Sequence, residues 1–208
     1  MKIGLLGGTF DPFHRGHLEP VLAVRSVMGW DRIVFVPASK QPFKADADQA
    51  SPFDRHAMAI LATEGNDALS VSDLELRRDS VSYTVDTLEA LRALDSESVF
   101  DWIIGDDNLA RLMEWRSIER VLELANFTVL DRRTGGEGGK RVPEELRDRV
   151  MDPAARGRAG AISFAANEMV PVSATEIRRR VRSGERIDEF VDPRVSRYIQ
   201  HYRLYKEA

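Results

Sequence analysis

Two histidines separated by three positions are the residues in this chain best suited to chemistry. His14 and His17 follow the pair Gly7-Gly8, with Gly16 between them, and a stretch of helical periodicity comes next. If a helix has begun by His14, both imidazoles lie on one face of it and can contact the same ligand. The glycines let the main chain turn sharply. Two imidazoles at a helix amino terminus favour a polyanionic phosphate, so the sequence predicts a phosphate site at this turn.

Other glycine-based nucleotide motifs do not fit this segment. The spacing of Gly4, Gly7 and Gly8 does not give the dinucleotide-binding fingerprint, and the chain has no Gly-Lys-Ser/Thr of a P-loop. A plain tight turn and a structural role for either histidine alone stay open as alternatives at this point.

Short apolar runs that alternate with helical segments must position these residues. Several of the runs are almost wholly apolar, as in strands that are covered on both faces of a parallel sheet. Strand and helix in strict alternation predict an α/β fold, Rossmann-like, with a doubly wound parallel sheet. The predicted strands are 2–6, 33–36, 69–74, 100–104, 127–130 and, more weakly, 162–164.

The chain is predicted to form one structural unit in two parts. Residues 1–170 form the Rossmann-like core, and residues 171–208 form a small helical part that splits into two helices near Asp192–Pro193. Residues 132–160 are rich in glycine and arginine. They predict a surface excursion with one short helix after Pro143.

Composition excludes several classes of function. The 208 residues are 43% hydrophobic and 31% charged, carry a net charge of −4 and include no cysteine. The net negative charge disfavours electrostatic binding to nucleic acid or to a membrane surface over a large area. The lack of cysteine removes disulfides, thiolate nucleophiles and cysteine-ligated metals. No apolar stretch approaches the roughly 20 residues that span a bilayer, so we expect a cytoplasmic protein.

Three further segments carry polar side chains at predicted strand-to-helix junctions. Ser173 with Glu176 forms the pattern of a capping box, in which the hydroxyl accepts from a backbone N–H and the glutamate reaches back. The run 82–88 brings hydroxyls to the same sheet edge, although Thr84 or Asp86 as a plain helix cap is an alternative. Gly105-Asp106-Asp107 ends the fourth predicted strand, where a carboxylate can accept from a ribose hydroxyl.

The opening segment resembles a known group of enzymes. Gly-Gly-Thr-Phe-Asp-Pro followed by His-x-Gly-His is similar to the start of nucleotidyltransferases that share the His-x-Gly-His signature. More narrowly, it resembles the bacterial nicotinate-nucleotide adenylyltransferases. Ser-Tyr-Thr-x-Asp-Thr-Leu at 82–88 is similar to a motif particular to these enzymes, and 173–178 match their Ser-x-Thr-x-Ile-Arg motif. The matches run from Gly7 to Arg178.

The resemblance implies a set of site residues. It implies catalytic roles for His14, His17, Lys44 and Arg178. It implies ATP contacts from Gly7, Gly8, Thr9, Phe10, His17, Asp107, Arg133, Ser173, Thr175, Ile177 and Arg178. It implies that the mononucleotide is held by Tyr83, Thr84, Asp86 and Trp115. No metal ligand is assigned, and Mg²⁺ is expected to arrive with ATP.

The sequence departs from the family pattern at two places. The family commonly has Pro-Pro-His-Lys after the second strand, whereas this chain keeps Lys44 but has Phe43 in place of the histidine. The family has Arg-Pro-Gly beside ATP, and here Thr134 replaces the proline after Arg133.

The implied reaction is adenylyl transfer from ATP to nicotinate mononucleotide. The expected partners are therefore these two nucleotides, without nucleic acid or membrane, and a homo-oligomer is left open. Two alternatives stay open on the sequence alone. One is another acceptor, either nicotinamide mononucleotide or phosphopantetheine. The other is a nucleotide-binding sensor without catalysis.

Overall fold

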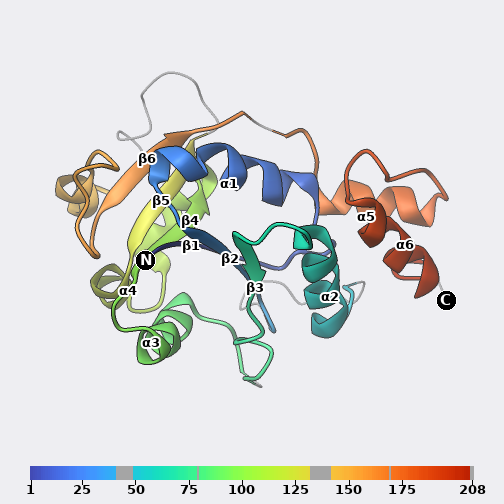
Figure 1. The fold of residues 1–208 in the computed structure, drawn as a ribbon, viewed down its shortest axis with the longest axis horizontal. Coiled ribbons are helices and arrows are strands. Elements are labelled where there is room, and N and C mark those ends of the chain that lie inside the picture. Colours follow the sequence, from blue (N-terminus) through green and yellow to red (C-terminus); the bar gives the residue numbers. More distant parts are fainter. Residues whose placement is uncertain (41–48, 79, 132–141, 169, 207–208) are drawn as a thin grey trace. The chain divides into compact units, whose positions relative to one another are not determined.

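Figure 1 shows the computed structural model, which describes residues 1–40, 49–78, 80–131, 142–168 and 170–206. The chain divides into two compact units, which we treat separately. The sheet unit comprises Met1–Gly7, Pro20–Val34 and Tyr83–Met169. The histidine unit comprises Gly8–Glu19, Phe35–Ser82 and Val170–Ala208. The predicted division at residue 170 into a core and a helical part remains a prediction.

Each of the six predicted apolar runs forms a strand. The strands are β1 Lys2–Gly8, β2 Arg32–Pro37, β3 Leu69–Val71, β4 Val99–Gly105, β5 Asn126–Asp131 and β6 Ile162–Ala166. They form one sheet in the order β3-β2-β1-β4-β5-β6, which confirms the doubly wound α/β prediction. Strand β3 ends earlier than predicted because the Ser72 hydroxyl accepts from the Leu74 N–H at 3.2 Å, and this local turn interrupts the strand.

The core of the sheet unit is built on β4 and β5. Parallel pairing places Leu6 of β1 beside Ile103 of β4, and Gly105 of β4 beside Leu130 of β5. Every residue of β5 is buried, as expected of a central parallel strand. Helices α3 (Thr84–Leu94) and α4 (Ile118–Leu124) pack against each other in this unit, and Figure 1 shows them as neighbours.

The remaining helices begin where the sequence supplies start signals. They are α1 Arg15–Met28, α2 Pro52–Thr63, α5 Ala174–Arg182 and α6 Pro193–His201, with 3-10 helices at Asp106–Glu114 and Glu144–Arg149. Ser51, Ser173 and Asp192 each cap a helix by accepting a backbone N–H. The predicted pair of C-terminal helices and the short helix after Pro143 are therefore confirmed. Among the described residues, no helix is long and apolar enough to cross a membrane.

The turn that carries the histidines differs from the prediction. Gly7 and Gly8 are the last residues of β1 and have no positive φ, so the prediction that they form the sharp turn is wrong. Phe10 makes the turn instead, with φ of 54°. Glycine is needed at position 7 because a Cβ there would come within 2.6 Å of the Trp102 ring. At position 8 a Cβ would lie 2.9 Å from the Phe10 ring.

Candidate functional site

The two histidines are brought together, but not by a shared helix face. Helix α1 begins at Arg15, so His14 lies just before it. The His17 N–H donates to the His14 carbonyl at 2.9 Å, which closes the first turn. The imidazole rings are stacked, with centroids 3.7 Å apart and planes at 22°. Because the two rings stack at the start of α1, both can contact the same ligand.

Both imidazoles are held neutral. Burial lowers the pKa of His14 to about 4. Burial, followed by the neighbouring His14 ring, lowers the pKa of His17 well below its usual value. The His17 Nδ1 accepts from the His14 backbone N–H at 3.2 Å, which places the proton of the neutral ring on Nε2. His17 thus presents an N–H donor rather than a positive charge.

Aromatic rings fix the orientation of His17. Phe10 meets it edge-on at 4.9 Å between ring centroids, and Phe13 lies at 5.5 Å. Phe35 in turn packs edge-on against Phe13 at 4.9 Å. Phe10 and Phe13 are fully buried, so the side chain of Phe10, a predicted ATP contact, supports the histidine from inside the unit.

The amino end of α5 lies against the histidine turn. A Cβ at Gly16 would come within 2.8 Å of the Val172 side chain and 3.1 Å of the His14 ring. Val172 directly precedes Ser173, the N-cap of α5. Gly16 is therefore the residue that lets the histidine pair and the start of α5 approach each other, and this end of a helix favours anions.

The predicted capping box at α5 is formed only in half. The Ser173 hydroxyl accepts from the Glu176 N–H at 3.2 Å. The prediction that Glu176 reaches back is wrong, because its carboxylate accepts from Arg179 and Arg180 at 2.8 Å. These hydrogen bonds lower the pKa of Glu176 to about 2. Two arginines bind the glutamate more strongly than one backbone amide does.

Arg178 is joined to the turn through Asp11. Its Nη1 donates to the Asp11 carbonyl at 2.8 Å and lies 3.6 Å from the Asp11 carboxylate. Tyr205 donates to the same carboxylate at 2.7 Å. Arg55 donates to the Thr9 carbonyl at 2.6 Å and so holds the preceding residues. Sequence reasoning assigned no role to Asp11 or Tyr205 and gave Arg55 no chemistry.

A second polar group lies in the sheet unit around Arg116. Its guanidinium lies over the Tyr83 ring, 4.7 Å from the centroid, and 3.7 Å from the Asp86 carboxylate. Tyr83 is the N-cap of α3 but makes no side-chain cap bond. Arg116 therefore joins two of the predicted mononucleotide residues, and the sequence reasoning missed it.

The other candidates of the sheet unit follow β4. Asp107 is exposed in the 3-10 helix directly after β4, and Asn108 donates to it at 3.3 Å. Trp115 ends that helix, is partly buried, and meets Phe127 of β5 edge-on at 5.7 Å. Asp107 is thus open to a ligand, whereas Trp115 is anchored on the core by its contact with Phe127.

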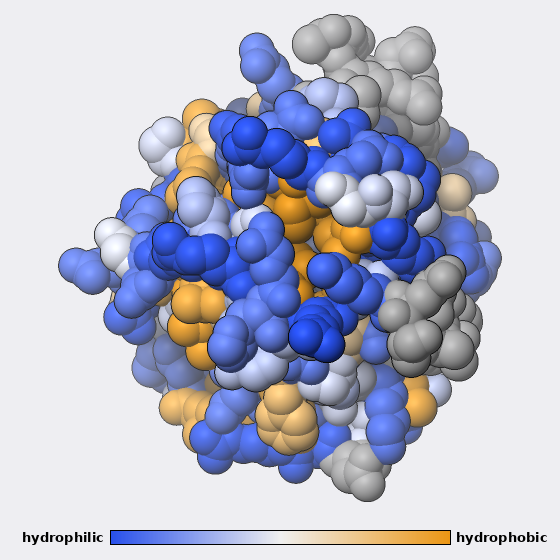
Figure 2. All heavy atoms as spheres, turned by 90° about the vertical axis from the view of Figure 1, so that its right-hand side faces the viewer, coloured by the Kyte–Doolittle hydropathy of each residue, from blue (hydrophilic) through white to orange (hydrophobic). Residues whose placement is uncertain are grey.

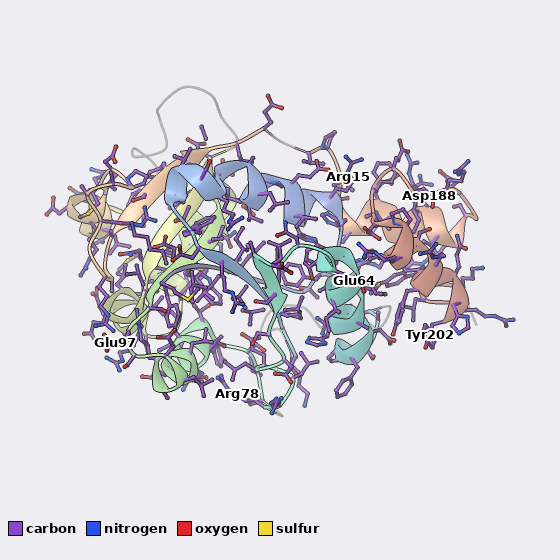
Figure 3. The ribbon with its side chains drawn as sticks, in the orientation of Figure 1. Arg15, Glu64, Arg78, Glu97, Asp188 and Tyr202 are labelled. Atoms are coloured by element: carbon purple, nitrogen blue, oxygen red, sulfur yellow. The ribbon has the colours of Figure 1, made fainter. Side chains whose placement is uncertain are left out.

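A cavity of about 280 Å³ lies beside His14 within the histidine unit. Its walls include Phe13, His14, Leu18, Val191 and Asp192. Arg15 and Asp188, both labelled in Figure 3, also line it. On the face shown in Figure 2, hydrophobic surface likewise lies recessed among hydrophilic side chains.

Comparison with known proteins identifies the family. The cytidylyltransferase-like family model matches residues 5–180. A probable nicotinate-nucleotide adenylyltransferase of Thermoanaerobacter sp. (strain X514) is 34% identical over 100% of this chain and 95% of its own. One of Pseudomonas putida (strain W619) is 38% identical over 99% and 95%.

The chain belongs to the nicotinate-nucleotide adenylyltransferase family.

A solved structure shows the same fold at lower identity. Plasmodium falciparum nicotinic acid mononucleotide adenylyltransferase, complexed with NaAD, superposes with a TM-score of 0.73 and 22% identity, covering 98% of this chain and 97% of that one. The Rossmann-like prediction and the resemblance stated from the opening motif are both confirmed by these comparisons.

The residues of the family's motifs fall into two groups, and each unit contains one group. The histidine unit brings together the residues predicted for phosphate: His14, His17, Ser173, Thr175 and Arg178. Ser173 and Thr175 are exposed, whereas Ile177 is fully buried, so its side chain packs inside the unit. Tyr83, Thr84, Asp86, Asp107 and Trp115 lie in the sheet unit.

Some predicted residues cannot be placed. Lys44 with Phe43, and Arg133 with Thr134, lie outside the described residues. Within the part of the chain that is described, no three or more histidine, aspartate or glutamate side chains group so as to hold a metal ion.

Proposed function

We propose that this chain transfers the adenylyl group of ATP to nicotinate mononucleotide and forms nicotinate adenine dinucleotide and pyrophosphate. The observation that carries the proposal is the stacked pair His14–His17 beside the amino end of α5, with Gly16 against Val172. This is a site of hydrogen-bond donors suited to phosphate. Relatives that match over the full length supply the substrate class.

The chemistry needs little covalent help from the protein. An oxygen of the mononucleotide phosphate forms a bond to the α-phosphorus of ATP, and the bond from that phosphorus to the bridging oxygen of pyrophosphate breaks. A phosphomonoester has its second pKa at about 6 and is already an anion at neutral pH. No general base is therefore required. The demand is alignment and stabilisation of charge that grows on the phosphates.

His17 and Arg178 are assigned the main work in the histidine unit. The His17 Nε2–H donates to a phosphate oxygen, because its Nδ1 is occupied by the backbone of His14. A neutral donor of fixed orientation stabilises developing negative charge without reorganising. Arg178 adds a permanent positive charge near the turn. His14 lies stacked on His17 and adds a second imidazole.

The mononucleotide is assigned to residues of the sheet unit. Trp115 offers an aromatic ring for stacking with the pyridine ring, and its T-shaped contact with Phe127 keeps it in place. Tyr83, Thr84 and Asp86 contribute polar groups at the start of α3. Asp107 is assigned to a ribose hydroxyl of ATP. Lys44 and Arg133 are retained as phosphate contacts on the resemblance alone.

Magnesium is treated as part of the substrate. The described residues offer no carboxylate cage, so none of them is assigned to hold the ion, and ATP is taken to enter as its Mg²⁺ complex. We place the reaction in the cytoplasm, without a nucleic acid or membrane partner. A homo-oligomer remains a prediction.

The test is an acceptor panel. Purified protein is given ATP, Mg²⁺ and one acceptor at a time: nicotinate mononucleotide, nicotinamide mononucleotide or phosphopantetheine. Pyrophosphate release is followed. We expect the highest kcat/KM with nicotinate mononucleotide. Turnover with phosphopantetheine alone would move the chain to another acceptor class. ATP binding by calorimetry without any product would indicate a sensor.

A further inference from the structure

Tyr205 is a buried residue that lies outside the sequence motifs that carry the predicted chemistry. It lies in the short segment after α6, three residues beyond Tyr202, which Figure 3 labels. It is 8% exposed and has a φ of 62°. That backbone conformation is unfavourable for a bulky side chain, so the position of the ring is maintained by what it contacts.

The contact that the ring makes is with the histidine turn. The Tyr205 hydroxyl donates to Asp11 Oδ1 at 2.7 Å, across 194 positions of sequence. The same oxygen accepts from the Ala50 N–H at 3.1 Å. Asp11 lies in the turn between Phe10, which has a positive φ, and His14. The C-terminal segment is therefore hydrogen-bonded to the loop that sets the entrance of α1.

Arg178 contacts the same residue from α5. It donates to the Asp11 carbonyl at 2.8 Å, while its guanidinium is 3.6 Å from Asp11 Oδ2. Among the described residues, Asp11 Oδ2 has no hydrogen-bond partner. The carboxylate is thus held toward Tyr205 and Ala50 and stays just beyond hydrogen-bond distance of Arg178.

We propose that Tyr205 is a positioning residue for adenylyl transfer. Its hydroxyl anchors the Asp11 carboxylate, and Asp11 in turn sets both the histidine turn and the guanidinium of Arg178. Without the hydroxyl, the carboxylate loses one of the two donors on Oδ1 and is no longer held in one orientation. The guanidinium of Arg178, which donates to the Asp11 carbonyl, then loses its fixed position relative to the phosphate. This inference rests on the proposed function.

The charges around Asp11 give the proposal a pH signature. Burial raises the pKa of Asp11, while the Tyr205 hydroxyl, the Ala50 N–H, Arg178 and Arg55 oppose that rise. Removal of the hydroxyl leaves the carboxyl with less support for its charged form. We therefore expect the acidic limb of the kcat profile to move to higher pH in Tyr205→Phe.

A matched control exists in the same unit. Tyr198 of α6 donates to Asp54 Oδ1 of α2 at 2.9 Å, which is the same kind of tyrosine–aspartate bond. Neither residue touches the histidine turn in any described contact. Tyr198→Phe therefore removes an equivalent hydroxyl at a place where only stability should change.

The experiment compares Tyr205→Phe, Tyr198→Phe and the unmodified protein by pyrophosphate release and by thermal unfolding. For Tyr205→Phe we expect kcat to fall about tenfold with KM for ATP changed less than about twofold, as loss of a hydrogen bond to a carboxylate allows. For Tyr198→Phe we expect kcat to stay within about twofold at a similar drop in Tm. In an Asp11→Asn background, Tyr205→Phe should have little further effect on kcat.

Three results would overturn the proposal: unchanged kcat and pH profile in Tyr205→Phe, equal kcat losses in both tyrosine variants, or additive losses with Asp11→Asn. Failure of the proposed function is a separate outcome. It would show as no pyrophosphate release by the unmodified protein with any of the three acceptors.

Discussion

Two buried charge clusters, one in each unit, show how differently this chain uses similar residues. In the sheet unit, Arg156 donates to Asp101 at 2.7 Å, with both side chains at most 1% exposed. Trp30 and Asn126 donate to the same carboxylate, so both of its oxygens are occupied. In the histidine unit, the described residues provide hydrogen-bond donors to only one oxygen of Asp11.

The position of each cluster explains the difference. Asp101 lies in β4, paired with Gly4 and with the first residue of β5. It is four positions before the strand end at Gly105, where α/β sheets bind ligands. Its hydrogen bonds join β4 to β5 through Asn126 and to the loops that contain Trp30 and Arg156. The Asp11 cluster lies in the turn beside the histidines and contacts Arg178. A buried carboxylate whose two oxygens both accept hydrogen bonds favours stability, whereas the geometry of one with donors on a single oxygen depends on those few bonds.

The largest effect should come from the sheet unit and should concern stability alone. Arg156→Met leaves the Asp101 carboxylate buried without its charge partner, which should lower the free energy of unfolding by about 3–5 kcal/mol. Chemical denaturation measures this loss. At a temperature where the variant is folded, kcat should be unchanged. The double variant with Asp101→Asn should recover part of the loss, and an equal or greater loss there would contradict the unpaired Asp101 carboxylate as its cause.

The second effect is a pH dependence of stability that arises in the histidine unit. His14 titrates near 6.5 when unfolded and at about 4 in the folded protein. As the pH falls from 6.5 toward 4, the His14 side chain becomes protonated in the unfolded chain but stays neutral in the folded protein. Stability therefore falls in that window, by up to roughly 3 kcal/mol from this residue. Denaturant midpoints at pH 7.5 and 4.5 measure the fall.

In His14→Gln the loss of stability between pH 7.5 and 4.5 should be smaller by most of that amount. The same pH dependence in His14→Gln as in the unmodified chain would show that this imidazole is not held neutral by burial.

The smallest effect tests the helix start beside the histidines. Ser173→Ala and Ser51→Ala each remove a cap that accepts a backbone N–H, and each should cost about 1 kcal/mol of stability. Only Ser173→Ala should also raise KM for ATP, because α5 begins beside Gly16. A change in KM of the same size in Ser51→Ala would mean that loss of a cap weakens ATP binding by destabilising the whole fold and not by changing the start of α5.

The fold was predictable because its signals are local. Apolar runs gave all six strands, the capping pattern at Ser173 gave the start of α5, and Asp192–Pro193 gave the division between α5 and α6. The turn was not predictable in detail. Glycine predicts a sharp turn, but Gly7 is required by the Trp102 ring packed against it, and the positive φ falls on Phe10.

The candidate site was predictable only where a motif carries it. The histidine pair, Arg178 and the start of α5 stand in recognisable patterns. Asp11 lay inside the quoted opening motif and could have been singled out as a charged residue in a turn. Tyr205 and Arg116 had no signal, since each acts through contacts to residues distant in sequence. Such contacts depend on packing, which local patterns do not encode.

The most direct test of the central claim is the turnover of His17→Ala. The claim is that neutral His17 donates from Nε2 to phosphate as charge develops. With ATP, Mg²⁺ and nicotinate mononucleotide at saturation, the account predicts a fall in kcat of at least about a hundredfold, as for loss of one transition-state donor. Calorimetry should still detect ATP binding. An unchanged kcat in a folded His17→Ala protein would contradict the account.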